Sequence, residues 1–188
     1  VLFRSATDKL RNLVRKGLIS MGKKFTSTQK ITISAICIAL YLVVMLCTQG
    51  FAFGQYQVRI ATALYGLSYN FPFLVFPFGI ANVTSNILMG SLGPLDAICG
   101  FFMGIAVSGA IVLGRKAGFG SWIVAAAVTL LPGLGVPLWL SPLLGIPYGI
   151  LVTGLLIGQL IAGIAGMLLI NALERADVLN FAFNTAKE

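Results

Sequence analysis

The region from 31 to 173 is almost entirely apolar. Its only charged residues are Arg59, Asp96, Arg115 and Lys116, and the last 57 residues of the region carry no charge. A helix that crosses a bilayer needs about 20 mostly apolar residues. The pattern therefore predicts an integral membrane protein in which spanning helices follow one another along the chain.

Clusters of basic residues indicate which ends of these helices face the cytoplasm. They lie at 23–30 and at 115–116, and a charged tail begins at Glu174. By the positive-inside rule the three segments should share one side of the membrane. The number of crossings before 115–116 is then even, and four short spans fit the 84 residues available better than two. The rest of the region holds two more.

We therefore predict an all-α membrane protein, a six-transmembrane-helix bundle with both termini in the cytoplasm. The second span is short for a full crossing, and a broken or tilted element is expected there. The expected spans are 31–48, 57–70, 73–89, 94–114, 120–136 and 147–173.

The chain divides into a basic cytoplasmic segment at 1–30, the membrane domain at 31–173 and a cytoplasmic tail at 174–188. Eight of the 13 basic residues lie in the first segment and account for most of the net charge of +8. The positive-inside rule explains such a segment without a nucleic-acid partner. We expect Met21 to be the natural start, with 1–20 as upstream sequence that is not native.

Four prolines recur every five residues around Trp139, at positions 132, 137, 142 and 147. Proline lacks a backbone N–H and interrupts a regular helix. The spacing predicts a fixed, folded loop from 132 to 147 over the outer mouth of the bundle. The alternative is an ordinary rigid turn with Trp139 as an interfacial anchor.

Two charges fall within the outer half of the predicted bundle. Asp96 follows Gly93-Pro94, which is typical of a helix start, so it is either a cap that complements the helix dipole or a ligand acceptor. Arg59 is expected at the same level. The two could pair, and Arg59 either supports the structure or faces a ligand.

Three carboxamides lie in otherwise apolar segments, at Asn82, Asn86 and Gln159. Each offers one acceptor and two donors, which suits the edge of a planar heterocycle, although hydrogen bonds between helices are the alternative role. Tyr56 and Trp139 could stack on the flat face of such a ligand or belong to an interfacial belt.

Small residues recur at intervals of four in three predicted helices. Helices approach closely at such positions, so stripes at 100–108 and 154–166 are expected to pack inside the bundle. Ala35 and Ala39 form the third stripe, which serves either packing or the docking of another membrane subunit.

The sequence gives no support to catalysis or to metal or cofactor binding. There is no histidine, the three cysteines are isolated, and no nucleophile, paired-carboxylate or P-loop motif is present. We expect the protein not to be an enzyme. Any transport driven by ATP would need an ATPase on another chain.

The segments 56–64 (YQVRIATAL), 79–82 (GIAN) and 93–100 (GPLDAICG) resemble the QueT family of queuosine-precursor transporters, and the likeness covers about 31–173. The resemblance implies an S component of an energy-coupling-factor importer in the bacterial cytoplasmic membrane. Such a protein binds a 7-deazaguanine and works with a transmembrane coupling subunit and two cytoplasmic ATPases. The stripe at Ala35 and Ala39 would dock the coupling subunit.

The chain departs from the family pattern at Thr62, where many relatives carry an acidic residue, and near Gln159, where another acidic residue is expected. Both departures bear on which ligand is carried. In the implied site Asp96 accepts the N–H donors of the ligand and Asn82, Asn86 or Gln159 contacts its carbonyl and ring nitrogen. Alternatives are another vitamin-like heterocycle as ligand, or a stand-alone carrier driven by ions.

Overall fold

The computed structural model describes residues 25–52, 59–89 and 92–176, and within them the chain is helical and contains no strand. Most of the predicted N-terminal segment and C-terminal tail lie outside the described residues. In chain order the elements are α2 (Ser27–Cys47), α3 (Gln49–Ala52), the 3₁₀ helices η1 (Ile60–Tyr69) and η2 (Pro72–Leu74), α4 (Val75–Met89), α5 (Pro94–Lys116), α6 (Trp122–Leu144) and α7 (Tyr148–Arg175).

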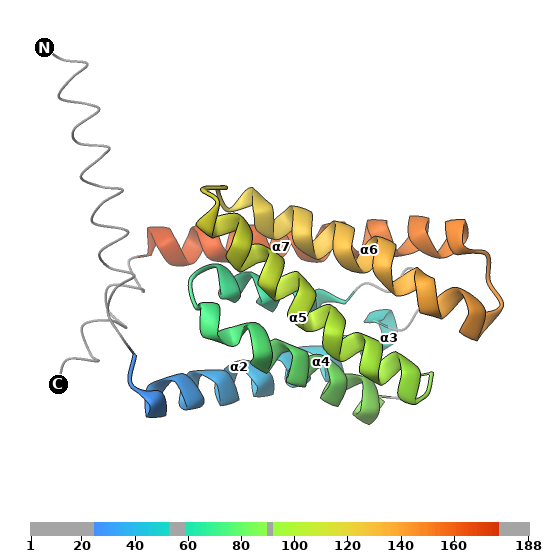
Figure 1. Cartoon of the computed structure of the whole chain (residues 1–188), viewed down its shortest axis with the longest axis horizontal. Coiled ribbons are helices and arrows are strands. Elements are labelled where there is room, and N and C mark those ends of the chain that lie inside the picture. The colour runs from blue at the N-terminus through green and yellow to red at the C-terminus, as the bar shows by residue number, and fades with distance from the viewer. Residues whose placement is uncertain (1–24, 53–58, 90–91, 177–188) are drawn as a thin grey trace, which may run out of the picture.

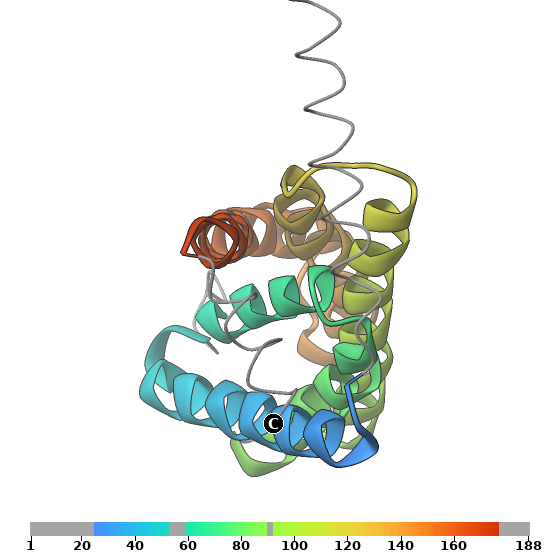
Figure 2. The ribbon, with the colours of Figure 1, turned by 90° about the vertical axis from the view of Figure 1, so that its left-hand side faces the viewer.

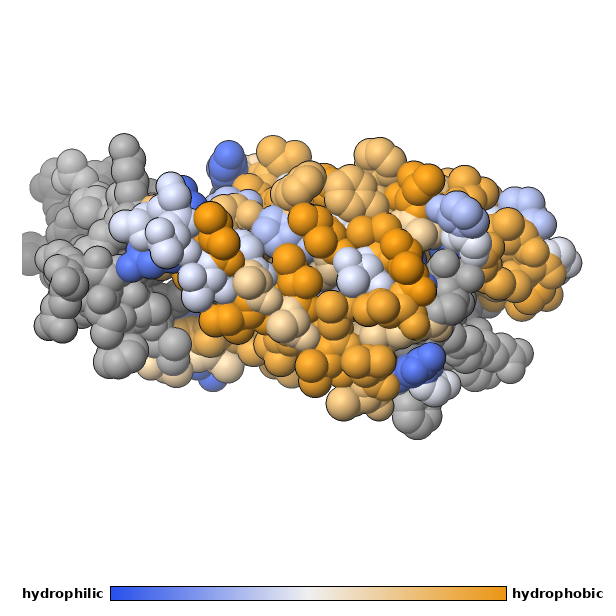
Figure 3. All heavy atoms as spheres, turned by 90° about the horizontal axis from the view of Figure 1, so that it is seen from below, coloured by the Kyte–Doolittle hydropathy of each residue, from blue (hydrophilic) through white to orange (hydrophobic). Residues whose placement is uncertain are grey.

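Five helical segments of the described chain are long and apolar enough to cross a membrane. They are α2, α5, α6, α7 and the continuous segment Pro72–Met89, which joins η2 to α4. Figure 3 shows one face of the molecule, on which apolar side chains cover the middle and the most hydrophilic ones lie toward the two ends. This surface is that of a multi-pass membrane protein.

The second predicted span is a different kind of element. η1 is a 3₁₀ helix of ten residues, eight of which are buried. At about 2 Å per residue it is roughly 20 Å long, shorter than the 30 Å or so of a hydrocarbon core. Six spanning helices were predicted. The described chain has five candidate spans, and the predicted second span is instead this short element inside the bundle.

The elements run alternately between the two ends of the bundle, so α2 begins and α7 ends at the same end (Figure 1). We call this the basic end, because Lys30, Arg115, Lys116 and Arg175 lie at the helix termini there. Seen along the bundle, α2, α4, α5, α6 and α7 surround η1, which lies between α7 and α2 (Figure 2).

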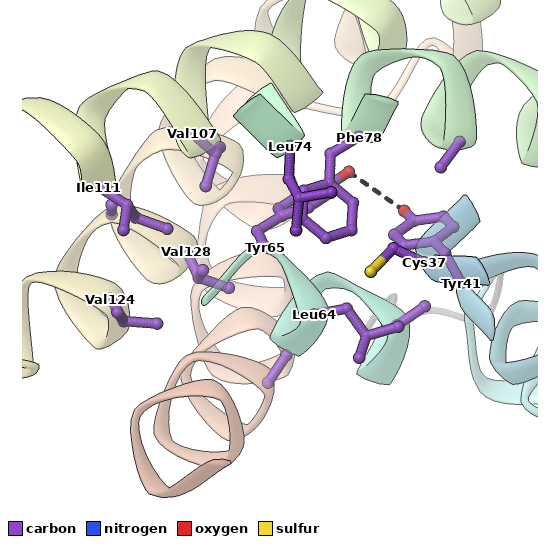
Figure 4. Close-up of a cluster of buried hydrophobic side chains, with 14 of the residues drawn as sticks. Cys37, Tyr41, Leu64, Tyr65, Leu74, Phe78, Val107, Ile111, Val124 and Val128 are labelled. Carbon is purple, nitrogen blue, oxygen red and sulfur yellow. Dashed lines mark hydrogen bonds between the residues drawn. The ribbon is translucent and has the colours of Figure 1, made fainter. Parts of the chain in front are cut away.

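Aromatic side chains hold η1 to its neighbours in the core. The hydroxyls of Tyr41 on α2 and Tyr65 on η1 are 3.2 Å apart, and the two rings stack with centroids 5.6 Å apart. Phe78 on α4 meets the Tyr65 ring edge-on at 5.3 Å. Figure 4 shows the hydrogen bond between the two tyrosines within this cluster. Tyr65 thereby connects three elements.

Arg115 fixes the other end of η1, at the basic end. Its guanidinium donates hydrogen bonds to the backbone oxygen of Tyr69 and, at 2.7 Å, to Asn70 Oδ1, and it lies 4.5 Å from the centroid of the Tyr69 ring. The short helix is therefore anchored to α5 where its last carbonyls would otherwise lack donors.

The predicted loop from 132 to 147 is wrong for most of its length. α6 continues through Pro132, Pro137 and Pro142 to Leu144, and the turn follows at 145–147, where Gly145 has a φ of +68°. An irregular segment at membrane depth would leave many backbone groups without partners, whereas a helix with prolines leaves only a few. The expectation failed because it applied a rule for helices in water.

The small-residue stripes on α5 and α7 lie at close contacts between elements. A Cβ at Gly104 would be 2.8 Å from the Phe78 carbonyl oxygen, and one at Gly166 would be 2.7 Å from the Ala63 carbonyl oxygen. The third stripe differs, because Ala35 and Ala39 are exposed on the outer face of α2. It therefore does not pack within the described bundle.

We predict that Gly104→Ala destabilises the bundle, because its Cβ would also lie 3.1 Å from the Gly79 Cα. Overpacking of this kind costs about 1–3 kcal/mol, and it should lower the unfolding temperature of the purified protein in detergent. Gly109→Ala is the matched control on the same helix, since nothing lies within 4 Å of its added Cβ. Equal effects of the two variants would contradict the packing assigned to α5.

Candidate binding cavity

A cavity lies in the half of the bundle away from the basic end. Its empty volume, which includes the open space at its mouth, is about 580 Å³. All the long helices except α2 contribute to its wall, together with η1. The lining residues are Arg59, Thr62, Tyr65, Asn82, Asn86, Leu92, Asp96, Gly100, Met103, Pro132, Val136, Trp139, Leu140, Leu155 and Gln159.

Six of the seven residues predicted for the binding site line this one cavity. They come from η1, α4, α5, α6 and α7, and are separated by up to 100 positions in the sequence. Tyr56, the seventh, lies outside the described residues. The six are Arg59, Asn82, Asn86, Asp96, Trp139 and Gln159.

The wall made by α4 and α5 holds both asparagines through backbone carbonyls. Asn82 Nδ2 donates to Gly100 O at 2.8 Å, and Asn86 Nδ2 donates to Asp96 O at 3.3 Å. Gly100 makes this possible, because a Cβ there would lie 2.5 Å from Asn86 Nδ2. Each amide nitrogen is thus directed at α5, and the opposite orientation would set two oxygens against each other.

Asn86 Oδ1 is left as a buried acceptor. The residue is 1% exposed, and this oxygen has no hydrogen-bond partner among the residues that the structure describes. A buried acceptor in this state costs about 1–3 kcal/mol unless a donor reaches it. In a residue that lines a cavity, a ligand can supply that donor.

The carboxylate of Asp96 joins the start of α5 to α6. Trp139 Nε1 donates to Asp96 Oδ1 at 2.9 Å, and Asp96 is 5% exposed. Its position in the first turn also complements the helix dipole. A carboxylate has about four lone-pair sites, so Asp96 retains capacity for further donors after binding the indole.

Arg59 and Asp96 do not form the ion pair considered from the sequence, since none joins them within the described chain. Arg59 Nη1 instead reaches Asn82 Oδ1 at 3.5 Å. Arg59 is the N-cap residue of η1, so its charge enters the cavity from that element. Both charges line the same space, each with a neutral neighbour.

Thr62, noted in the sequence as a departure from the family pattern but not predicted as a site residue, also lines the cavity. Its hydroxyl oxygen lies 2.6 Å from Arg59 O and 2.9 Å from Gln159 Oε1. One hydroxyl proton cannot serve both oxygens. If the Gln159 amide is turned over, its nitrogen donates to Thr62 while Thr62 donates to Arg59, and all three groups are satisfied. Thr62 and Gln159 thus form a neutral, mutually bonded pair between η1 and α7.

The spacing along η1 explains why Thr62 was missed. A 3₁₀ helix has 3.0 residues per turn, so Arg59, Thr62 and Tyr65 share one face, and all three line the cavity. The spacing of three was visible in the sequence, but nothing there indicated a 3₁₀ helix. The apolar wall of α6 was missed for another reason, because a loop had been expected where the helix presents Val136 and its neighbours.

The family model for the QueT transporter matches residues 31–175. The chain belongs to the QueT transporter family. The matched region includes every element that lines the cavity, so the family assignment made from the three segments above is confirmed. No curated protein and no solved structure matched the chain in our comparisons. This QueT-family protein is therefore a multi-pass membrane transporter by its family and its five candidate spans.

We predict that Trp139→Phe lowers stability, because it removes the indole donor from a buried carboxylate. A hydrogen bond to a charged group contributes about 1.5–3 kcal/mol, which thermal or denaturant unfolding in detergent would measure. Trp122→Phe is the control at an exposed position of the same helix and should change little.

The combination of Trp139→Phe with Asp96→Asn completes a double-mutant cycle. Because the two side chains are in contact, the cycle should give a coupling energy of about 0.5–3 kcal/mol. Additive effects would show that the contact contributes nothing to folding.

Proposed function

We propose that this QueT-family protein is the substrate-binding S component of an energy-coupling-factor importer. In this function the chain captures a 7-deazaguanine, either a queuosine precursor or queuine, from outside the cell. A transmembrane coupling subunit and two cytoplasmic ATPases then complete the uptake. Family membership supports small-molecule transport, and the cavity chemistry supports a planar heterocycle as the cargo.

The observation that carries the proposal is the pair of acceptors on the α4–α5 wall. Asn86 Oδ1 lacks a partner among the described residues, and Asp96 lines the cavity beside it. A guanine-like edge presents a ring N–H and an amino group side by side, and a carboxylate accepts both together. A ligand with this edge satisfies the wall without needing a charge of its own.

The remaining cavity groups suit the other parts of such a ligand. Arg59 is a donor for the ring carbonyl, and Gln159 adds an amide on the α7 side. The indole of Trp139 and the ring of Tyr65 offer flat apolar surfaces for a planar bicycle. The cavity lies at the end of the bundle opposite the basic end. The positive-inside rule assigns the basic end to the cytoplasm, so the cavity faces outward in the proposed function.

The outer face of α2 supports the docking of a coupling subunit. Only 11% of its apolar window is buried, against 39–44% for the other candidate spans, so this helix stands at the edge of the bundle. Ala35 and Ala39 lie exposed on it, one turn apart. Small residues at this spacing allow another helix to approach closely in lipid.

A stand-alone carrier driven by ions is less well supported. Such carriers place ionisable residues for proton or ion coupling near the membrane midplane. Every Asp, Glu, Lys or Arg of the described spans lies near a helix end, and Arg59 directly precedes η1. Those in the spans are Lys30, Asp96, Arg115, Lys116, Glu174 and Arg175. Uptake by the chain alone in liposomes with an imposed ion gradient, without ATPase subunits, would favour the carrier.

We predict that the purified chain binds a 7-deazaguanine without ATP. A ligand at 100 times its dissociation constant stabilises a protein by about 2.7 kcal/mol, so the unfolding temperature in detergent should rise with ligand concentration. Asp96→Asn should weaken binding by at least about tenfold, a change of 1.4 kcal/mol. It should lower stability less than Trp139→Phe does, because the Asn oxygen can still accept from Trp139 Nε1. Normal affinity with a large loss of stability would make Asp96 a helix cap only.

We also predict that Ala35→Leu and Ala39→Leu abolish copurification with the coupling subunit while ligand binding survives, because the added bulk separates the two helices. Ala106→Leu is the matched control, since Ala106 is an exposed alanine on α5. Loss of folding in the two α2 variants but not in the control would instead assign Ala35 and Ala39 to internal packing.

A further inference from the structure

Asp96 is the only acidic residue between 31 and 173. The segments at 53–58 and 90–91, whose structure is not described, contain no Asp or Glu either. The membrane domain therefore has a single carboxylate with which to bind a positive charge. In the proposed function that carboxylate is occupied by the donor edge of the ligand and by Trp139 Nε1, 2.9 Å away.

The far side of the cavity carries no acidic group. A rigid bicyclic ligand with its donor edge against Asp96 directs its opposite side away from the α4–α5 wall, toward groups on η1 and α7. Figure 2 shows α7 across the ring of helices from α4. Thr62 and Gln159 line the cavity there, 3% and 1% exposed, and their polar atoms are 2.9 Å apart.

Arg59 makes a cation in this space less favourable still. Its side chain lines the same cavity. Thr62 is neutral, and its hydroxyl donates to the backbone carbonyl of Arg59. A primary amine on the ligand would be protonated at neutral pH, because alkyl amines titrate near pH 10. Burial of that ammonium beside a guanidinium and a neutral amide leaves it without a counter-charge.

We propose that the cavity selects 7-deazaguanines whose 7-substituent is uncharged, and that the Thr62–Gln159 pair sets this preference. The inference rests on the proposed function and narrows its substrate to precursors with a neutral 7-substituent. It excludes queuine, because the 7-substituent of queuine contains an amine that is protonated at neutral pH. Nitrile and hydroxymethyl substituents can hydrogen-bond with the amide of Gln159 or the hydroxyl of Thr62 at no cost in buried charge. An aminomethyl substituent has nearly the size of a hydroxymethyl substituent, so the cavity discriminates against it by its charge and not by its size.

The test compares three ligands on the full chain in detergent by isothermal titration at pH 7. They are 7-cyano-, 7-hydroxymethyl- and 7-aminomethyl-7-deazaguanine, and the last two form a pair matched in size that differs in charge. We expect the two neutral ligands to bind at least about tenfold more tightly than the aminomethyl compound, a difference of 1.4 kcal/mol. Equal or tighter binding of the aminomethyl compound would overturn the inference and leave the proposed function standing.

Two variants assign the preference to the pair. Gln159→Glu keeps the size of the side chain and adds a carboxylate, and Thr62→Asp adds one from η1. In either variant that folds, the discrimination against the aminomethyl ligand should fall by at least about tenfold. Unchanged discrimination in a folded variant would overturn the role of the pair. Gln159→Met, which removes the amide without adding charge, should weaken the hydroxymethyl and aminomethyl ligands alike.

Failure of all three ligands and of queuine to bind the folded wild-type chain would overturn the proposed function and this inference with it. Binding of queuine without binding of the two neutral ligands would overturn the inference alone. Binding without discrimination likewise overturns only the inference. The wild-type comparison requires no substitution, so it decides the question even if a carboxylate at 159 or 62 prevents folding.

Discussion

In a bundle surrounded by lipid, each backbone N–H and C=O must find its partner within the protein, because the hydrocarbon offers none. This requirement shapes the two elements that define the cavity. α6 stays helical through Pro132, Pro137 and Pro142, since a loop would leave far more groups unpaired. η1, too short to cross the membrane, is enclosed by helices on its sides, with Arg115 supplying donors to its last residues.

The same requirement determines the composition of the cavity. Its asparagines are held by backbone carbonyls of α5, and its carboxylate is held by a neutral indole. These neutral partners fix the direction of each side chain, so no second charged group has to be buried to hold it. What remains available to a ligand is a wall of acceptors on α4 and α5 and a neutral pair on η1 and α7, an arrangement that favours a polar but uncharged guest.

The polar residues of the cavity could be predicted from the sequence because an apolar chain gives them few other places to lie. Asp96, Asn82, Asn86 and Gln159 each interrupt an apolar segment, and a polar group there must face the interior. Thr62 does not stand out in this way, since a hydroxyl can bond to its own helix. Only the 3₁₀ geometry of η1 turns it toward the cavity.

The elements themselves were predicted less evenly. Apolar length sufficed for α4, α5 and α7, but α2 begins at Ser27, before the expected 31, because Thr26 and Gln29 form a capping box. The prolines of α6 were interpreted as a loop. A proline inside a helix is tolerated in lipid because an irregular segment there would find no water to hydrogen-bond with its backbone groups. The sequence indicated that the second predicted span is short. It could not indicate that η1 is buried, because its burial depends on the five helices around it.

The position of η1 also relates the cavity to the rim of the bundle. Tyr65 lines the cavity, and its hydroxyl is bonded to that of Tyr41 on α2, whose opposite face carries Ala35 and Ala39. α2 itself contributes no side chain to the cavity wall. A group that binds against Tyr65 therefore contacts α2 indirectly, through the stacked and hydrogen-bonded pair of Tyr65 and Tyr41. Only these aromatic side chains separate the ligand from the helix that is proposed to bind the coupling subunit. In the proposed function, capture and coupling thus use different surfaces that share one contact, and α2 can engage a partner without disturbing the polar wall on α4 and α5.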